Sequence, residues 1–249
     1  MNLLQMHNLK WNFEPKLKVS EIFCSIQGEG LHTGIPSLFL RLSGCNLRCT
    51  WCDTPYSSWI PEGEDLSLEK VVEKTLELAD GLTVQHVVIT GGEPYIYSEL
   101  PWLVQAFKNA HKTVTVETAG TIFKETNADL ISLSPKLSNS TPSEIEFPNE
   151  SKRHSQLRLN LEVLTQFMSK SADLQLKFVI DESEQINEIE ELIDALPPIS
   201  LDKIFVMPQA RDANELHTAS LKLVPWCLKK GFRLSTRLHL SLWGNCPGT

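Results

Sequence analysis

Apolar and polar residues alternate along residues 37–42, which is the pattern of a strand with one buried face. This period of two places Leu38, Leu40 and Leu42 on one face of the strand and Ser37, Phe39 and Arg41 on the other. Residues 19–26 carry a weaker pattern of the same kind. We expect these two segments to form neighbouring strands near the start of the fold.

Short apolar runs then alternate with segments of helical period over the rest of the chain. The first dozen residues have no clear period and are predicted to form a loose arm. Residues 136–151, rich in Ser, Pro and Asn, are predicted to form a long surface loop. Further strands are expected at 86–90, 113–118, 129–134, 174–180, 203–207 and 232–240, and helices at 68–76, 100–111, 156–170, 186–196 and just before Gly231.

Strands that alternate with helices are typical of a parallel sheet covered by helices, so the predicted class is α/β. About six core strands are expected, mainly parallel, which is too few to close an eight-stranded barrel. We therefore predict a partial, open β/α barrel. No linker or internal repeat divides the chain, so residues 1–249 are expected to form a single domain with a loop insertion at about 137–151.

The composition narrows the classes of function. The net charge is −8 and no run of Lys or Arg could follow a phosphate backbone, so a nucleic-acid partner is not expected. No apolar segment is long enough for a signal peptide or a membrane span, so no membrane partner is expected. Six cysteines, three of them within one loop, do not resemble a disulfide framework and fit a cytoplasmic protein.

The candidate chemistry is concentrated at Cys45, Cys49 and Cys52, which form a C-x3-C-x2-C pattern. Three thiolates this close can each bind one iron of a [4Fe–4S] cluster and leave the fourth iron open to a small molecule. A zinc knuckle and a disulfide with one spare thiol are the simpler alternatives. Zinc usually needs a fourth ligand and a second cysteine pair, which this chain lacks.

Polar residues also follow several of the predicted strands, where a parallel sheet collects reactive groups. The motif Gly91-Gly92-Glu93-Pro94 follows one strand, and Glu117 ends the next. The two glycines could instead belong to a simple turn between a strand and a helix. Glu117 could instead be a strand-end carboxylate on the solvated rim of the sheet. Arg41 shares a strand face with Phe39, and its planar fork suits a carboxylate ligand, although an arginine here could instead tune a cluster.

The cysteine motif together with Gly91-Gly92-Glu93-Pro94 resembles the radical S-adenosylmethionine (SAM) enzymes. The segments Ile26-Gln-Gly-Glu-Gly30 and 34–41, followed by Cys52-Asp-Thr54, resemble the 7-carboxy-7-deazaguanine synthase family in particular. The resemblance extends from about Glu21 to the C-terminus and is weakest over 138–151. It implies the same fold class, a partial radical SAM barrel.

The resemblance also implies an activity, namely conversion of 6-carboxy-5,6,7,8-tetrahydropterin to 7-carboxy-7-deazaguanine with loss of ammonia. The implied cofactors are a [4Fe–4S] cluster, SAM and Mg²⁺. The implied partners are the pterin substrate, an electron donor such as flavodoxin or ferredoxin, and a second copy of the chain in a homodimer. An activating enzyme for a glycyl-radical protein and a non-catalytic metal or electron-transfer protein remain as alternatives.

Roles for single residues follow from the same resemblance. Thr54 would bind Mg²⁺ through its hydroxyl, since Mg²⁺ prefers oxygen ligands. Thr249 would accept hydrogen bonds from the substrate through its terminal carboxylate, on a C-terminal segment that Trp243 anchors. The other implied substrate contacts are Ile26, Gln27, Gly28, Arg41 and Thr90, and the implied SAM contacts are Trp51, Cys52, Asp53, Gly92, Glu93, Glu117, Ser134, Pro135, Lys136 and Gln209.

Overall fold

One open sheet of nine strands organises the structure, a computed structural model that describes residues 16–181, 185–246 and 248. Its order is β3-β1-β2-β4-β5-β6-β7-β8-β9, and every neighbouring pair from β2 to β9 is parallel. The strands are β1 (Lys16–Ile26), β2 (Pro36–Leu42), β3 (Glu64–Ser67), β4 (His86–Gly91), β5 (Thr113–Thr118), β6 (Leu130–Leu133), β7 (Leu174–Ile180), β8 (Ile204–Pro208) and β9 (Arg233–Leu234). The predicted α/β class and open parallel sheet are confirmed, and the predicted arm lies outside the described residues.

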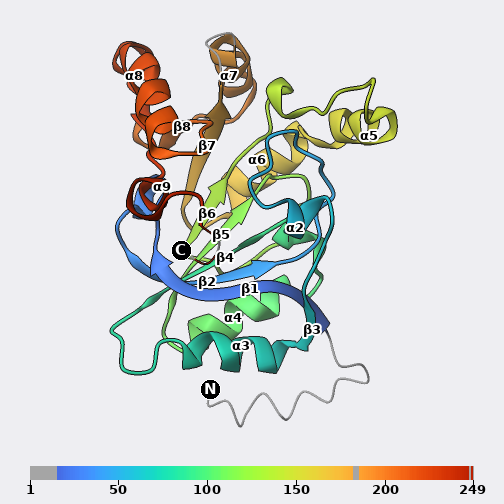
Figure 1. Cartoon of the computed structure of the whole chain (residues 1–249), viewed down its shortest axis with the longest axis vertical. Helices are drawn as coiled ribbons and strands as arrows, with labels where there is room; N and C mark the ends of the chain where they lie inside the picture. The colour runs from blue at the N-terminus through green and yellow to red at the C-terminus, as the bar shows by residue number, and fades with distance from the viewer. Residues whose placement is uncertain (1–15, 182–184, 247, 249) are drawn as a thin grey trace.

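Helices pack along the sheet and leave its carboxyl edge open (Figure 1). α3 packs on β1 and β2, α4 on β5, and α8 on β8 and β9. The helices are α2 (Pro55–Ser58), α3 (Leu68–Glu77), α4 (Leu100–Asn109), α5 (Pro148–Leu157), α6 (Leu161–Lys170), α7 (Gln185–Ala195), α8 (Ala213–Lys230) and α9 (Leu238–Trp243), with short 3-10 turns η1 (Gly30–His32), η2 (Pro94–Ile96), η3 (Ser138–Ser140) and η4 (Leu201–Lys203). None of the described helices is long and apolar enough to cross a membrane.

The side chains of β2 lie on two different faces of the strand, as the alternation predicted. Leu38, Leu40 and Leu42 are fully buried in the main hydrophobic core, beneath the sheet. Phe39 and Arg41, on the other face of the strand, line a cavity at the carboxyl edge. β1 runs antiparallel to β2 and pairs with it in continuous register from Glu21 onward. One face of this strand pair thus builds the core and the other builds the site.

The surface loop predicted at 136–151 is confirmed over residues 141–147, which form no helix or strand, and is wrong where η3 and the start of α5 form. The segment contains the turn η3 and the start of α5, and both Ser140 and His154 are fully buried. The helix predicted at 156–170 is two helices, because the side chain of Asn160 accepts hydrogen bonds from the backbone N–H groups of Glu162 and Val163 and caps α6. The polar composition of this region suggested a loop. The side chains of Ser140, His154 and Asn160 instead form hydrogen bonds within the fold.

The strand predicted at 232–240 is also wrong. Only Arg233 and Leu234 pair with β8, after which the chain turns and forms α9. In α9 the buried residue is Leu240, whereas 44 % of Trp243 is exposed. Trp243 therefore does not anchor the C-terminal segment, as the sequence suggested.

A buried histidine connects three strands at the amino ends of the sheet. Ser37 Oγ donates to the carbonyl of Ile35 (2.8 Å), so it accepts from His86 Nδ1 (2.7 Å). His86 Nε2 then accepts from Thr115 Oγ1 (2.8 Å). Burial, and next the neighbouring His32, lowers the pKa of His86 to about 4. The imidazole is therefore neutral in the folded protein near neutral pH.

We predict that the free energy of unfolding decreases as pH falls from 6.5 to about 4. In this range the unfolded chain binds a proton on His86 that the folded protein does not bind, so protonation favours unfolding. The pKa difference of His86 corresponds to about 3 kcal/mol. Urea denaturation across this pH range measures the effect.

The control is His86→Asn, whose amide can still donate to Ser37. Its unfolding free energy should fall less steeply with decreasing pH, whereas the buried His154 contributes equally in both proteins. An identical pH dependence in the two proteins would rule out His86 as the source.

Candidate active site

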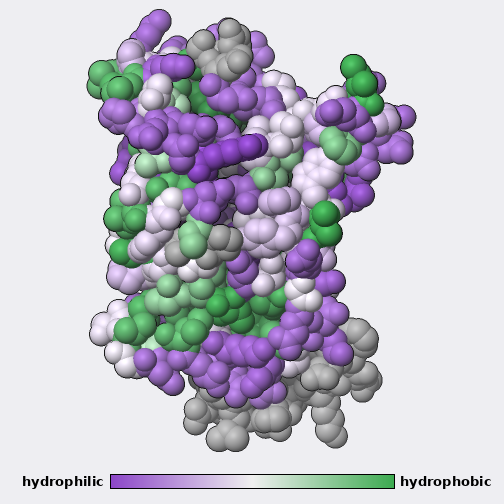
Figure 2. Space-filling view, viewed as in Figure 1, coloured by the Kyte–Doolittle hydropathy of each residue, from purple (hydrophilic) through white to green (hydrophobic). Residues whose placement is uncertain are grey.

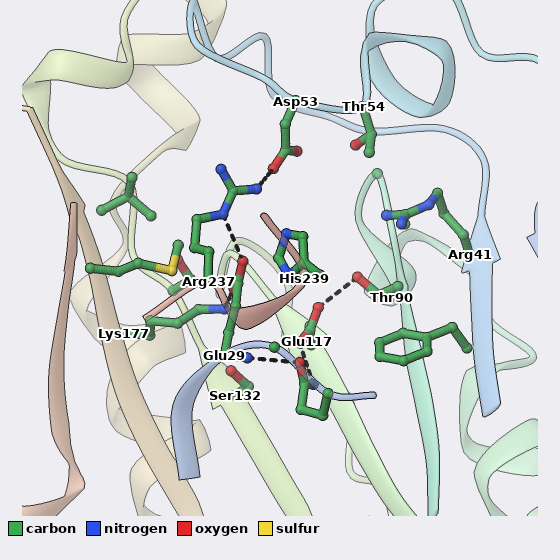
Figure 3. A pocket seen from close by; sticks show the side chains of 18 of the residues that line it. Glu29, Arg41, Asp53, Thr54, Thr90, Glu117, Ser132, Lys177, Arg237 and His239 are labelled. Carbon is green, nitrogen blue, oxygen red and sulfur yellow. Dashed lines mark hydrogen bonds and ion pairs between the residues drawn. The ribbon is translucent and has the colours of Figure 1, made fainter. Parts of the chain in front are cut away.

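A cavity of about 260 Å³ opens at the carboxyl ends of the strands. Figure 2 shows this face hollowed and lined largely by hydrophilic residues, and Figure 3 shows charged side chains from several elements pointing into the cavity. Most residues predicted from the sequence meet here. They are Ile26, Gln27, Gly28, Arg41, Trp51, Asp53, Thr54, Thr90, Gly92, Glu117, Ser134, Lys136 and Gln209.

Some predicted residues do not line this cavity. Glu93 and Pro135 are buried behind it, and Cys45, Cys49 and Cys52 lie in the loop beside it. Thr249 lies outside the described residues. Three neighbouring residues, Asn245, Cys246 and Gly248, line the cavity and so bring the C-terminal segment to the site.

The loop with the three cysteines connects β2 to α2. The carbonyl of Gly44 accepts from the backbone N–H of Glu93 (2.9 Å), and Gly44 N–H donates to Ser57 (2.7 Å). Burial raises the pKa of Cys45 to about 12 and that of Cys49 to about 11. Both thiols are therefore protonated until a metal displaces the proton.

The donor set of this loop fits an iron–sulfur cluster. In the described part of the chain, no three His, Cys, Asp or Glu side chains are grouped so that they could hold one metal ion. A tetrahedral zinc site would need such a group, whereas a cubane binds each thiolate at a different iron. Three thiols in one short loop, without a fourth protein ligand, suit the cubane.

Two glycines allow the loop to lie directly on the end of β4. Gly91 has a φ of +139°, and a Cβ there would lie 2.0 Å from the carbonyl oxygen of Leu42. A Cβ on Gly92 would lie 2.1 Å from the carbonyl oxygen of Gly44. A side chain at either position would push the cysteine loop away from the sheet.

The side chain of Glu93 is held behind the cavity by hydrogen bonds to β5 and to the turn after β4. It is fully buried and accepts hydrogen bonds from Thr118 Oγ1 (2.7 Å) and from the backbone N–H groups of Tyr95 (3.1 Å) and Ala119 (2.9 Å). Burial raises the pKa of this carboxyl group. Glu93 thus ties the end of β4 to the end of β5 and supports the cavity from behind.

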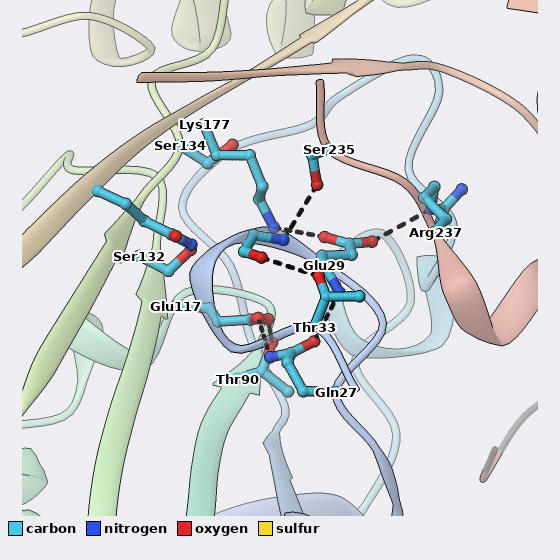
Figure 4. A network of polar contacts seen from close by, with 12 residues as sticks. Gln27, Glu29, Thr33, Thr90, Glu117, Ser132, Ser134, Lys177, Ser235 and Arg237 are labelled. Carbon is cyan, nitrogen blue, oxygen red and sulfur yellow. Dashed lines mark hydrogen bonds and ion pairs between the residues drawn. The ribbon is translucent and has the colours of Figure 1, made fainter. Parts of the chain in front are cut away.

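Glu117 lies among residues that were assigned to the substrate. Its carboxylate accepts from Gln27 Nε2 (3.1 Å) and from Thr90 Oγ1 (2.8 Å), as Figure 4 shows. Gln27 in turn accepts from the backbone N–H of Glu29 (3.1 Å). These contacts connect the end of β1 with β4 and β5.

An ion-pair network built on the buried side chains of Lys177 and Arg237 closes one side of the cavity (Figures 3 and 4). Lys177 and Arg237 both pair with Glu29, and Arg237 Nη2 donates to Asp53 (2.5 Å). Burial opposes ionisation of Glu29, but the charges of Lys177, Arg237 and His239 outweigh it and hold the pKa of Glu29 well below its usual range. The same carboxylate holds the pKa of Lys177 above its ordinary value despite burial.

Lys177, Arg237 and His239 line the cavity but were not predicted as site residues from the sequence. Lys177 had a recognisable signal, because it is a charge within the apolar strand β7 and is only 5 % exposed. His239 packs so closely on Gly28 that a Cβ there would lie 2.2 Å from His239 Nδ1. This contact places α9 as a wall of the cavity.

The opposite wall holds Arg41 in a fixed orientation. Glu21 accepts from Arg41 Nε (2.7 Å) and from the Tyr56 hydroxyl (3.2 Å), and Figure 3 shows the guanidinium pointing toward the cavity. Phe23 and Phe39 stack in parallel beside it, with ring centroids 4.9 Å apart. A cation and a flat aromatic surface therefore border the same space.

The side of the cavity next to the cysteine loop carries Trp51 and Lys136. Lys136 Nζ donates to Ser134 Oγ (2.9 Å) and lies 5.6 Å from the centroid of the Trp51 ring. The buried Nε1 of Trp51 has no hydrogen-bond partner among the described residues. An unsatisfied buried donor beside a cavity indicates room for a ligand that accepts a hydrogen bond.

Known proteins resemble this chain in sequence and in fold. Residues 40–140 match the Radical SAM superfamily. A 7-carboxy-7-deazaguanine synthase from Rhodopirellula baltica is 40 % identical over 95 % of this chain and 90 % of its own, and one from Halobacterium salinarum is 35 % identical over 94 % and 93 %.

Among solved structures, QueE from Escherichia coli shares the fold, with a TM-score of 0.65 at 24 % identity over 90 % of this chain and 95 % of that one. The superfamily match identifies the cofactors as a [4Fe–4S] cluster and SAM. The sequence identities extend over nearly the whole of both chains. This chain therefore belongs to the 7-carboxy-7-deazaguanine synthase family of radical SAM enzymes.

Proposed function

We propose that this chain converts 6-carboxy-5,6,7,8-tetrahydropterin to 7-carboxy-7-deazaguanine with loss of ammonia. The observation that carries the proposal is one cavity that joins Arg41, the Gln27–Thr90–Glu117 cluster and the cysteine loop. The names of the relatives support the same product. The substrate needs a cation for its carboxylate and hydrogen-bond acceptors for its ring N–H groups, and this cavity offers both.

The cofactors are proposed to bind along the cysteine loop. Cys45, Cys49 and Cys52 would hold the [4Fe–4S] cluster, and the Gly92 turn, Trp51 and the pair Ser134 and Lys136 would hold SAM. When bound, these two cofactors together supply one-electron chemistry that removes a hydrogen atom from the substrate. Asp53 and Gln209 line the same side and complete the proposed SAM contacts.

The protein's own part in catalysis is to orient the substrate and exclude water. Arg41 would bind the carboxylate through its terminal nitrogens, because Glu21 already engages Nε. The aromatic pair Phe23 and Phe39 would border the pterin ring. Glu117, held by Gln27 and Thr90, would accept from the ring N–H groups, and Ile26 and Gly28 would shape the adjacent wall.

Three further proposals concern the whole protein. We propose a single domain, because one continuous sheet takes strands from residue 16 to residue 234. A radical SAM enzyme requires a reductant, and we propose flavodoxin or ferredoxin for this role. We also propose a homodimer, which sedimentation of the purified protein would test.

The cluster assignment predicts the outcome of a cysteine substitution. Anaerobically reconstituted protein should contain about four irons and form product from the carboxypterin. Cys49→Ala should lose the cluster absorbance, SAM cleavage and product formation together. Cys227→Ala, a change at a buried cysteine in α8, should retain all three. A full cluster in Cys49→Ala would contradict the cluster assignment, and an intact cluster that leaves the carboxypterin unchanged would contradict the proposed reaction.

Arg41 is predicted to act mainly on substrate binding. Arg41→Lys keeps the charge but loses the planar fork, so KM for the carboxypterin should rise by about tenfold or more. The dissociation constant of SAM should change little. The matched control is Arg153→Lys on the exposed surface of α5, which should behave as the wild type. An unchanged KM in Arg41→Lys would place the carboxylate elsewhere.

Mg²⁺ binding by Thr54 is the third prediction. The Thr54 hydroxyl lines the cavity and accepts from Ser57 Oγ (3.1 Å), which leaves an oxygen lone pair free for a cation. Removing Mg²⁺ should slow turnover much more than it weakens SAM binding, and Thr54→Ala should lose most of the response to added Mg²⁺. Thr54→Ser should keep that response. A rate that is insensitive to chelation in the wild type would exclude the site.

A further inference from the structure

Two supports hold the cysteine loop from opposite sides. The inner support is the glycine turn at the end of β4, described above. The outer support is the segment 137–157, which includes η3 and α5 and overlaps the surface loop predicted at 136–151. Figure 1 shows the cysteine loop beside α5 and next to α2. Backbone groups of the loop bond directly to this segment.

The contacts converge on Cys49. The backbone N–H of Arg48 donates to His154 Nδ1 (3.1 Å), and the backbone N–H of Thr50 donates to the carbonyl of Ser140 (2.9 Å). The two residues that flank Cys49 in sequence are thus both held by the outer segment. Neither bond involves a cysteine sulfur, so both leave the thiol free for iron.

The contact geometry determines the tautomer of His154. Since Nδ1 accepts from Arg48, the proton lies on Nε2, which donates to Ser140 Oγ (2.9 Å). Ser140 Oγ donates in turn to the carbonyl of Leu137 (2.6 Å). His154 is fully buried, so water cannot replace either partner. The imidazole of His154 therefore accepts a hydrogen bond from the cysteine loop and donates one to η3.

A third contact holds the carbonyl group of Cys49. Trp59 Nε1 donates to the carbonyl of Cys49 (3.0 Å), and the Trp59 ring packs edge-to-face against Phe147, with centroids 5.1 Å apart. Phe147 immediately precedes α5. The outer segment thus restrains the peptide groups on both sides of Cys49.

The outer segment is itself attached to the body of the fold. Arg158 donates to the carbonyl of Lys136 (2.8 Å) and pairs with Glu188 of α7 (3.0 Å). The carboxylate of Glu188 also accepts from the backbone N–H and the hydroxyl of Ser138. Both ends of the segment are therefore fixed, which a restraint on the cysteine loop requires.

We propose that residues 137–157 act as a clamp that fixes the backbone around Cys49, with His154 as its positioning residue. The proposal rests on the proposed assignment of the cluster to Cys45, Cys49 and Cys52. A restrained loop keeps the Cys49 thiolate near its iron after a transient dissociation. The clamp should therefore slow loss of the cluster rather than take part in the reaction.

The test measures how fast the reconstituted protein loses iron to a chelator under anaerobic conditions, without SAM or substrate. His154→Ala removes the acceptor for Arg48 N–H, and iron loss should accelerate by about tenfold or more. His154→Asn places an amide oxygen near the position of Nδ1 and should restore slow loss. His154→Gln extends past that position and should resemble His154→Ala. The electron paramagnetic resonance signal of the reduced cluster should broaden in the fast variants.

Ser151→Ala is the matched control, because Ser151 is buried on the same helix and, within the described part of the chain, its side chain makes no hydrogen bond to the cysteine loop. It should lose iron at the wild-type rate. Phe147→Ala, at a residue that is 41 % exposed, tests the third contact without a buried cavity and should accelerate loss less than His154→Ala does.

Wild-type rates in both His154→Ala and Phe147→Ala would overturn the clamp. Fast loss in His154→Asn or in Ser151→Ala would show that packing of α5, and not the bond to Arg48, is responsible, and would overturn the role of His154. A wild-type protein that binds no cluster would instead refute the cysteine assignment, so the two failures are distinguishable.

Discussion

The shape of the cavity depends on two ion pairs, which the carboxylate of Glu29 forms with Lys177 and Arg237. It connects the loop after β1 to β7 and to the segment before α9, and Arg237 extends the network to Asp53 in the cysteine loop. Removing one partner from a buried ion pair typically costs about 3–5 kcal/mol, because the other charge is left without compensation. Three loops far apart in the chain are therefore held in one arrangement.

The cysteine loop depends on a different constraint, the lack of space beneath it. Gly91 and Gly92 bring the end of β4 into contact with the backbone of Leu42 and Gly44, where no side chain fits. Glu93 then uses its buried carboxylate to tie this turn to β5. The position of the loop is thus set by backbone contact below and by residues 137–157 above. A soft ligand set on a restrained backbone suits a cluster that must keep one iron open.

The two walls of the cavity differ in chemistry. Arg41 and the stacked pair Phe23 and Phe39 offer a cation beside a flat apolar surface. On the other side of the cavity, Lys136 lies over the ring of Trp51, a residue of the cysteine loop whose buried Nε1 has no partner among the described residues. A planar, anionic substrate fits the first wall, and a cofactor with acceptor groups fits the second. Both walls border one cavity at the same edge of the sheet, so the proposed substrate and SAM sites face each other.

Local patterns in the sequence determined the elements and the position of the chemistry. Alternation in β2 predicted which leucines are buried, because the period of a strand allows only two faces. The spacing of Cys45, Cys49 and Cys52 predicted a cluster loop, and its place after a strand predicted the edge of the sheet on which the site lies. Each of these conclusions rests on residues close together in the chain.

The tertiary structure alone decided which distant residues complete the site. Lys177 and Arg237 lie 148 and 208 residues from Glu29 in the sequence, and no local period connects them. Ser140 belongs to a polar segment whose composition suggested a surface loop, and His154 follows that segment closely, yet both are buried and bonded to the cysteine loop. Composition and periodicity indicate only whether residues of a given type are usually buried or exposed. Only strand order and helix packing decide which polar groups find partners and can therefore be buried.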